Sequence, residues 1–243
     1  MDNNGNSNYY SADSSYGVAL SFCIGLVTEE SLWNELYDAI DDPNASYRTK
    51  YAVGDKLPYT IGDNVYHAVI AGIDVDEDEN GNKVPVTFVT EELYAETAKM
   101  NDTQSNEGGW RDSKMRKTTM PAIEALLPEH LRNRINAVKK VSGLYPSGTQ
   151  ETFDTVWIPS EYEMTGSGYE GTGAEYTDLF VDDSARIKHH AIANMYWLRT
   201  ADDSHSISFR WVSPSGTTDY SRSDYGTPFP VCFSVGHIPE KIQ

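Results

Sequence analysis

The chain has 243 residues, of which 39% are hydrophobic and 12% aromatic, enough apolar material to form a packed core and to exclude global disorder. Its 19 basic and 37 acidic residues give a net charge of −18, which repels nucleic-acid backbones and anionic lipid headgroups. No apolar run approaches the roughly 18 residues of a membrane helix, and no secretory signal is visible. We therefore expect no nucleic-acid partner and no membrane insertion.

The first predicted elements are a strand and a helix. Residues 17–24 (GVALSFCI) form an apolar run that predicts a buried strand. Thr28 predicts the start of a helix, because Glu29 and Glu30 follow it at the positive end of the helix dipole, and residues 41–44 (DDPN) predict its end. The apolar face of this helix consists of Leu32, Trp33, Leu36, Tyr37, Ala39 and Ile40.

Two strands, near residues 65–74 and 84–90, follow and are joined by an acidic turn with an Asn-Gly hairpin signal. The turn also resembles the start of a calcium loop, with ligand-type residues at positions one, three and five and a glycine at position six. Thr87 stands at position twelve, where a bidentate Glu is needed, so we favour a solvated hairpin tip over calcium. Positions one, three, five and six of this motif are Asp76, Asp78, Asn80 and Gly81.

The middle of the chain predicts helices and then strands. Residues 91–135 are expected to be helical, with Pro121 and Pro128 at helix starts. Strands are expected at 137–141 and 153–158, followed by a short helix that Ser160 and Glu163 cap. The glycine-rich segment 164–176 predicts a flexible loop. The alternating pattern from Ala193 onward predicts strands and loops. Inward-facing residues of the helical part are Ile123, Leu126, Leu127, Leu131 and Ile135.

Helices and strands are segregated along the chain, which indicates an α+β fold. We find no His-x-x-x-His or Cys-x-x-Cys metal motif, no Gly-x-Ser-x-Gly elbow and no distinctive carboxylate pair. Cys23 and Cys232 lie inside apolar runs and are expected to be buried hydrophobes; if their strands pair, a disulfide is the alternative. We therefore expect no catalytic residue, no metal and no cofactor, and no enzyme activity.

The two cysteines lie in similar cassettes. Residues 8–24 and 218–235 both contain a run of Tyr, Ser and Asp, then Tyr-Gly, then an apolar strand. Aligning Tyr16 with Tyr225 also aligns Cys23 with Cys232. Residues 1–27 are therefore either the remnant of a preceding domain or a first strand beside the last, and residues 28–243 form the main domain.

Three linked signatures carry a family resemblance: GGWRDSKMRK with LLPEHLRNRI (108–135), DTVWIPSEYEM (154–164), and YWLRT with FRWVSPSG and PVCFSV (196–235). They resemble a domain family of unknown function that is abundant in gut bacteria and their phages. The resemblance implies a C-type-lectin-like fold, of the branch that includes formylglycine-generating enzyme, with short mixed or antiparallel sheets, a few flanking helices and long loops. The chain departs from the family at 226–235 (GTPFPVCFSV), because the family-like ending GVALSFCI stands at 17–24.

Relatives in that branch include the variable proteins of diversity-generating retroelements, in which mutagenised AAY codons become NNY. NNY codons cannot encode Lys, Glu, Gln, Met or Trp. These five types make up 41 of the 243 residues, but only Trp211 occurs among the 39 residues of 3–16 and 201–225. Exposed loops usually collect Lys and Glu, so this depletion favours diversification over ordinary turn composition.

We therefore expect a ligand- or receptor-binding display protein of a phage or bacterial surface, with a hypervariable, Tyr-rich face near the C-terminus. Its partner would be a protein or glycan on a host or target cell, and the chain could form oligomers. A second patch is expected at 8–13 (Asn8, Tyr9, Tyr10 and Asp13), and core anchors at Trp197, Leu198, Phe209 and Val212. The expected ligand-binding residues are Asp203, His205, Ser206, Ser208, Arg210, Thr218, Tyr220, Arg222 and Asp224.

Two alternatives stand beside this expectation. One is a structural virion protein whose polar run faces neighbouring subunits. The other is an enzyme related to formylglycine-generating enzyme, which would require paired, accessible thiols.

Overall fold

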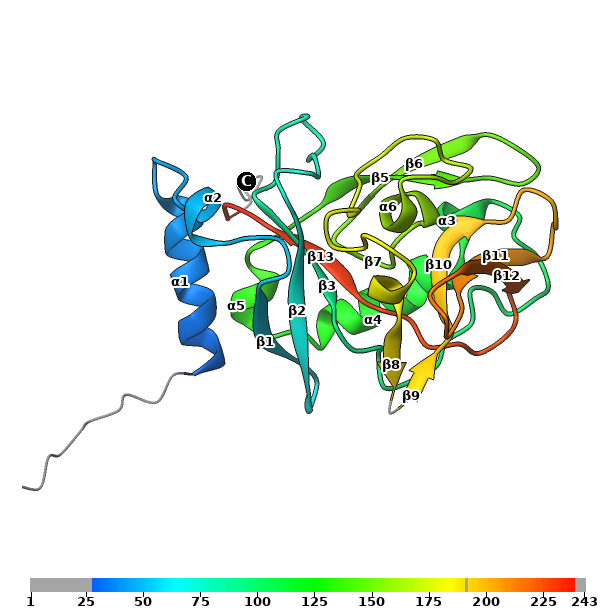
Figure 1. Ribbon diagram of the computed structural model, residues 1–243, viewed down its shortest axis with the longest axis horizontal. Coiled ribbons are helices and arrows are strands. Elements are labelled where there is room, and N and C mark those ends of the chain that lie inside the picture. The colour runs from blue at the N-terminus through cyan, green and yellow to red at the C-terminus, as the bar shows by residue number, and fades with distance from the viewer. Residues whose placement is uncertain (1–27, 191, 239–243) are drawn as a thin grey trace, which may run out of the picture.

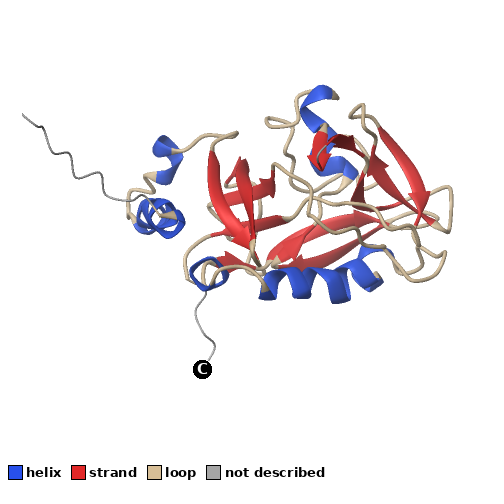
Figure 2. Cartoon of the chain, turned by 90° about the horizontal axis from the view of Figure 1, so that it is seen from below, coloured by secondary structure: helices blue, strands red, loops and turns tan. Residues whose placement is uncertain are grey.

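The computed structural model describes residues 28–190 and 192–238, and its strands form a central layer with helices on opposite sides (Figures 1 and 2). Every strand pair among these residues is antiparallel. This confirms the α+β class with short sheets, few helices and long loops. The central sheet has the order β1 (Lys56–Ile61), β2 (Asn64–Ile73), β3 (Val86–Thr90), β13 (Cys232–Val235) and β4 (Ile135–Asn136), and β7 (Val156–Trp157) also pairs with β13.

Three smaller sheets complete the strands. They are the hairpin of β5 (Val138–Gly143) and β6 (Thr149–Asp154), the hairpin of β8 (Lys188–His190) and β9 (Ile192–Asn194), and the sheet of β10 (Tyr196–Ala201), β11 (Ser208–Val212) and β12 (Thr218–Arg222). In Figure 1 the sheet of β10 to β12 lies at the end of the molecule opposite to the first helix.

The helices are short, apart from the first. Its predicted cap is confirmed, because the Thr28 side chain accepts the backbone N–H of Ser31. No helix within the described residues has the length and hydropathy needed to cross a bilayer. The helices are α1 (Glu29–Asp41), α2 (Tyr47–Lys50), α3 (Gly109–Asp112), the π-helical turn η1 (Met115–Thr119), α4 (Met120–Ala125), α5 (Glu129–Arg132), α6 (Glu161–Thr165) and the 3₁₀ turn η2 (Ser184–Arg186).

The core forms where α1 packs on the central sheet. The Trp33 ring lies 5.2 Å from that of Phe88, which in turn lies 5.5 Å from Phe233 on β13. The indole N–H of Trp33 donates to the carbonyl of Pro58 at 2.8 Å. β13 is paired on both sides and fully buried, so residues 232–235 are a framework strand, as predicted.

The expected helical stretch 91–135 is wrong in its first half. Residues 92–108 form no helix, because their backbone groups bond to the chain before β13: Tyr94 N–H donates to Phe229 O, and Asn101 N–H donates to Ser223 O. The later helices do begin beside the two prolines: α4 begins at Met120, before Pro121, and α5 begins at Glu129, after Pro128. Leu126, expected inside, is 48% exposed, because α4 ends at Ala125 and the helical period stops there.

The glycine-rich segment 164–176 is also more than a flexible excursion. Glu170 and Tyr176 within it are buried, and Tyr176 N–H donates to the carbonyl of Glu163. The preceding helix α6 has the predicted capping box of Ser160 and Glu163. The loop therefore covers the core and fixes α6. The cassette at 8–24, with Cys23 and the second patch at 8–13, lies outside the described residues.

Candidate functional site

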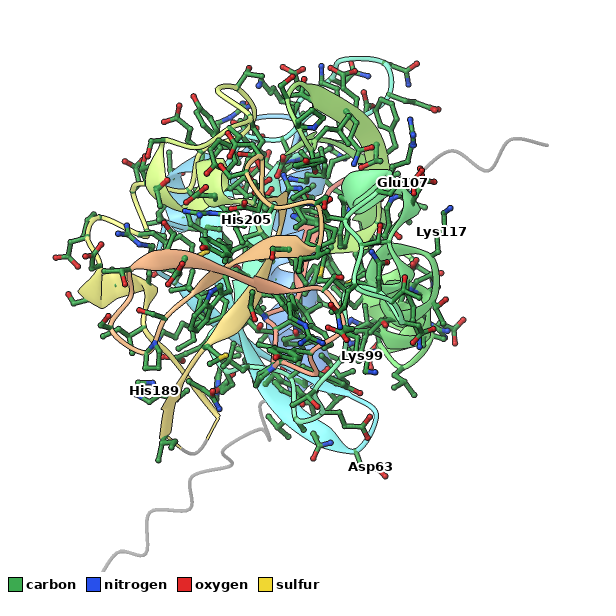
Figure 3. The ribbon with its side chains drawn as sticks, turned by 90° about the vertical axis from the view of Figure 1, so that its right-hand side faces the viewer. Asp63, Lys99, Glu107, Lys117, His189 and His205 are labelled. Atoms are coloured by element: carbon green, nitrogen blue, oxygen red, sulfur yellow. The ribbon has the colours of Figure 1, made fainter. Side chains whose placement is uncertain are left out.

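The nine predicted ligand-binding residues lie on β11, on β12 and in the loops at their ends, at the end of the molecule that faces the viewer in Figure 3. β11 and β12 pair with Ser208 opposite Arg222 and Arg210 opposite Tyr220. Cross-strand partners share one face of a sheet, so these four residues and Thr218 project to the same side. We call the exposed part of this region the β12 face; its residues are Asp203, His205, Ser206, Thr218, Tyr220, Arg222, Asp224 and Tyr225.

A stacked aromatic pair lies on the β12 face. The rings of His205 and Tyr220 are parallel to within 21° and their centroids are 4.1 Å apart. The His205 side chain is 44% exposed and Tyr220 is 42% exposed. His205 Nδ1 lies 2.8 Å from a carboxylate oxygen of Asp202, which fixes the imidazole. The pair offers an aromatic surface to solvent that is already held in place.

An ion pair lies farther along β12. The guanidinium of Arg222 contacts both carboxylate oxygens of Asp224, at 3.1 and 2.9 Å, and lies 4.7 Å from the ring centroid of Tyr225. The side chains of Arg222 and Asp224 are 38% and 20% exposed, and Tyr225 is 48% exposed. These groups are accessible to a partner, and Tyr225 extends the predicted set.

Two of the nine residues are not surface contacts. Ser208 is buried, and the Arg210 side chain is only 14% exposed. Arg210 faces α6 and donates to both carboxylate oxygens of Glu161, at 2.7 and 3.2 Å, and it also reaches Asp202. Arg210 does project to the same side of the sheet as Tyr220, as predicted, but Glu161 at the start of α6 covers it there. Arg210 therefore supports the sheet.

Asn106 holds the loop that carries His205, and no signal in the sequence singled it out. Its side-chain amide is buried and donates to the carbonyls of Asp202, His205 and Ser208, at 3.0, 3.0 and 2.8 Å. Its backbone N–H donates to the carbonyl of Ser206. One side chain thus holds three backbone carbonyls, between the end of β10 and the start of β11, and limits the conformations that the loop can adopt.

Tyr169, in the glycine-rich loop, lies beside the face and was also missed. Its ring lies 5.6 Å from the guanidinium of Arg210, and it is 39% exposed. Burial, with a further contribution from the hydrogen bond to Asp203, raises the pKa of Tyr169 to about 12, so it remains a hydrogen-bond donor at neutral pH. Tyr169 thus adds a third exposed phenol to those of Tyr220 and Tyr225.

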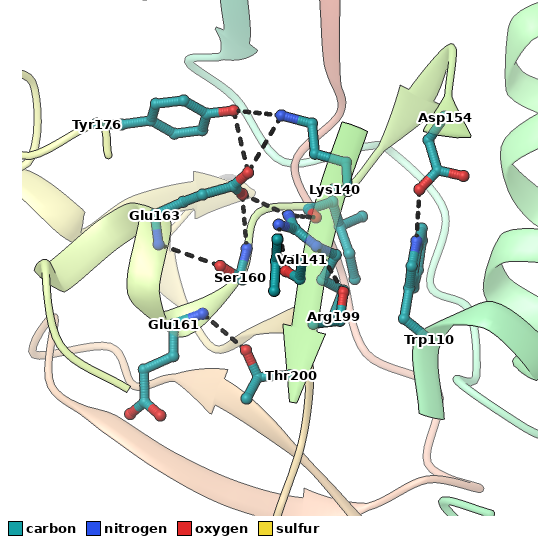
Figure 4. A network of polar contacts seen from close by, with 12 residues as sticks. Trp110, Lys140, Val141, Asp154, Ser160, Glu161, Glu163, Tyr176, Arg199 and Thr200 are labelled. Atoms are coloured by element: carbon teal, nitrogen blue, oxygen red, sulfur yellow. Dashed lines mark hydrogen bonds and ion pairs between the residues drawn. The ribbon is translucent and has the colours of Figure 1, made fainter. Parts of the chain in front are cut away.

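A buried polar network joins side chains of α6, β5 and β10 (Figure 4). Glu163 on α6 accepts from Arg199 and from Lys140, and Lys140 Nζ also contacts Asp76 at 2.5 Å. These side chains are each 1% exposed. Burial alone would raise the pKa of Glu163, but Arg199 and Lys140 lower it to about 2. The network joins α6, β5 and β10 into one rigid support, with no access for a substrate.

The predicted anchors are confirmed: Trp197, Leu198, Phe209 and Val212 are all fully buried. Phe209 lies on the opposite side of β11 from Arg210, so β11 is held from the core side by Phe209 and from the other side by α6.

The hairpin interpretation of the acidic turn is confirmed. Asp76 is 2% exposed and its carboxylate accepts from Thr87, at 2.7 Å, and from Lys140, so it faces the core. Asp78 accepts from Asn80 N–H and Asn82 N–H within the turn. Among residues 28–190 and 192–238, one group of three metal-ligating side chains comes together elsewhere, at His67, Glu91 and Glu92.

Cys232 is fully buried, as predicted, and burial raises the pKa of its thiol well above the ordinary value. Thiol nucleophiles and metal ligands react as thiolates, so this sulfur is unsuited to either task. Its position opposes the alternative of a thiol-dependent enzyme.

Comparisons with known proteins support one assignment. Residues 85–236 match the model of a family described as a domain of unknown function, DUF6273. No curated protein and no solved structure matches the chain. The matched residues run from the start of β3 past the end of β13 and include the whole β12 face. The chain therefore belongs to the DUF6273 family.

Proposed function

We propose that this chain is a ligand-binding display protein of a phage or bacterial surface, and that the β12 face is its binding surface. The observation that carries the proposal is the stacked pair of His205 and Tyr220, half exposed on a loop and strand that are held from below. Pre-organised aromatic side chains give large contact area at low entropic cost, and neighbouring Ser, Asp and Arg give adaptable hydrogen bonds.

The ligand is a protein in this proposal. Calcium-dependent sugar binding in lectins of this type uses Glu-Pro-Asn or Trp-Asn-Asp, and neither motif occurs in the chain. Asp203, in the same loop as His205, adds negative charge near the aromatic pair, which favours a partner that presents basic groups.

The scaffold of this proposal is a C-type-lectin-like fold. The antiparallel sheets, the short helices and the long loops support it. The sheet of β10 to β12 then presents the variable residues, and β13 closes the framework.

Diversification of the β12 face belongs to the same proposal. The DNA beside the gene tests it: we expect a near-copy of the region coding for 193–235 that differs only at adenines, next to a reverse transcriptase. A locus that lacks the near-copy or the reverse transcriptase contradicts diversification. It does not contradict ligand binding by a β12 face of fixed sequence.

The binding surface must tolerate change without unfolding. We would randomise Asp203, His205, Ser206, Tyr220, Arg222 and Asp224 with NNY codons, display the library on yeast and measure resistance to protease. A control library would randomise the buried Ser208, Phe209, Arg210 and Val212. We expect most clones of the first library and few of the second to resist cleavage. Equal loss in both libraries contradicts the proposal.

The structural-protein alternative predicts a different use of the same face. If the β12 face packs against other subunits, light scattering should show an assembly that Tyr220→Ala dissociates. The binding proposal expects no effect of this substitution on the mass of the particle.

A further inference from the structure

Three side chains that can bind a metal meet at the end of β3, outside the β12 face. His67 lies within β2, and Glu91 and Glu92 directly follow β3. The two strands are neighbours, and Glu91 N–H donates to the carbonyl of His67 at 2.8 Å. Backbone pairing therefore brings the three residues to one place.

The ligand atoms of His67, Glu91 and Glu92 all lie within 4.8 Å of one another. Glu92 is held twice by His67: one carboxylate oxygen lies 2.7 Å from Nδ1, and the other accepts the backbone N–H at 2.9 Å. The three side chains are between 38% and 46% exposed, so an ion can enter from solvent and the side chains can adjust to it. Backbone pairing and these hydrogen bonds thus hold two carboxylates and one imidazole close together.

A cation already occupies part of this place. Lys56 Nζ lies 2.5 Å from a carboxylate oxygen of Glu91, on a side chain that is 47% exposed. The exposed ammonium can move into water and leave the Glu91 carboxylate to a stronger cation. Below the site, Lys188 donates to the backbone carbonyls of Thr90 and Glu91, which fixes the chain that carries the two acids.

We propose that His67, Glu91 and Glu92 bind a divalent transition-metal ion of the Zn²⁺ class, with water completing the coordination. Imidazole nitrogen favours Zn²⁺, Ni²⁺ or Cu²⁺ over Mg²⁺ and Ca²⁺, which prefer oxygen ligands alone. Three protein ligands with an open position suit a tetrahedral ion. The bound ion links the β1–β2 hairpin to the segment after β3. From the sequence alone we expected no metal site, so this proposal departs from that expectation.

Titration of the full chain with ZnCl₂ by isothermal calorimetry tests the proposal. We expect one saturable site, which His67→Ala and Glu92→Gln each weaken by about tenfold or more. Lys56→Gln should tighten binding, because it removes the competing ammonium; a purely structural defect would not do so. Zn²⁺ should raise the melting temperature of the wild type but not that of His67→Ala.

A matched control separates this site from the other histidines. His237 contacts a single carboxylate, that of Asp41 at 3.0 Å, so His237→Ala should leave the affinity unchanged. Four results would overturn the proposal: no saturable binding by the wild type, equal binding by His67→Ala, equal weakening by His237→Ala, or tighter binding of Mg²⁺ than of Zn²⁺.

Discussion

Arg210→Ala tests whether the β12 face rests on a support that is distinct from its contact residues. The substitution leaves the Glu161 carboxylate, whose side chain is 8% exposed, without the two guanidinium bonds that it now accepts. Removing one partner of a buried ion pair costs roughly 3 kcal/mol in free energy of unfolding. For a chain of this length that corresponds to a fall in melting temperature of about 6–12 °C.

Thermal unfolding followed by circular dichroism measures this effect, and Arg222→Ala is the matched control. Arg222 occupies the same face and also pairs with a carboxylate, but the pair is exposed, so we expect its loss to leave the melting temperature nearly unchanged. The double variant Arg210→Ala/Glu161→Leu should recover part of the lost stability, because it removes the unpaired charge. Equal destabilisation by the two Arg→Ala variants would show that Arg210 supports the fold no more than an exposed ion pair does.

Three further predictions concern buried side chains: Asn106, Glu163 and Cys232. Asn106→Ala should cost about 2–3 kcal/mol in urea unfolding and speed hydrogen exchange in residues 202–208, because it frees three loop carbonyls; unchanged exchange would contradict this role. The lowered pKa of Glu163, about 2 against an ordinary 4.5, stabilises the fold above about pH 4.5, and this contribution is lost as the pH falls towards 2. Glu163→Gln should therefore be less stable at neutral pH and flatter in its urea midpoint across that window; a parallel shift at every pH would count against the network. In a Cys23→Ser background, the Cys232 thiol should react with Ellman's reagent only after unfolding, and rapid reaction of the folded chain would show that it is accessible.

Local patterns in the sequence predicted the parts of the fold that depend on neighbouring residues. Thr28 and the Ser160–Glu163 capping box predicted where α1 and α6 begin, and the Asn-Gly turn predicted the β2–β3 hairpin. Residues 92–108 could not be predicted in this way, because their hydrogen bonds go to the chain before β13, more than 100 residues later.

The candidate site shows the same division. The alternation of polar and apolar residues predicted that Ser208, Arg210, Thr218, Tyr220 and Arg222 belong to one surface, and they do share one side of the sheet. His205 and Tyr220 were predicted as separate contact residues, and only the structure shows that their rings stack. The alternation could not show that Glu161 covers Arg210, because α6 and β11 meet only in the folded chain. Asn106 also escaped prediction, since a single Asn in a loop has many uses and its three carbonyl partners lie about 100 residues away.

Binding of the fluorescently labelled chain to intact human-gut bacteria, measured by flow cytometry across a panel of strains, tests directly whether the β12 face binds a cell-surface ligand. We expect saturable binding to some strains, and we expect Tyr220→Ala and His205→Ala to abolish it. Phe153→Ala should retain binding, because this aromatic side chain is 43% exposed, as much as Tyr220, but lies on β6, outside the β12 face. If the chain shows no saturable binding to any strain, or if all three variants bind equally, the β12 face is not the binding surface.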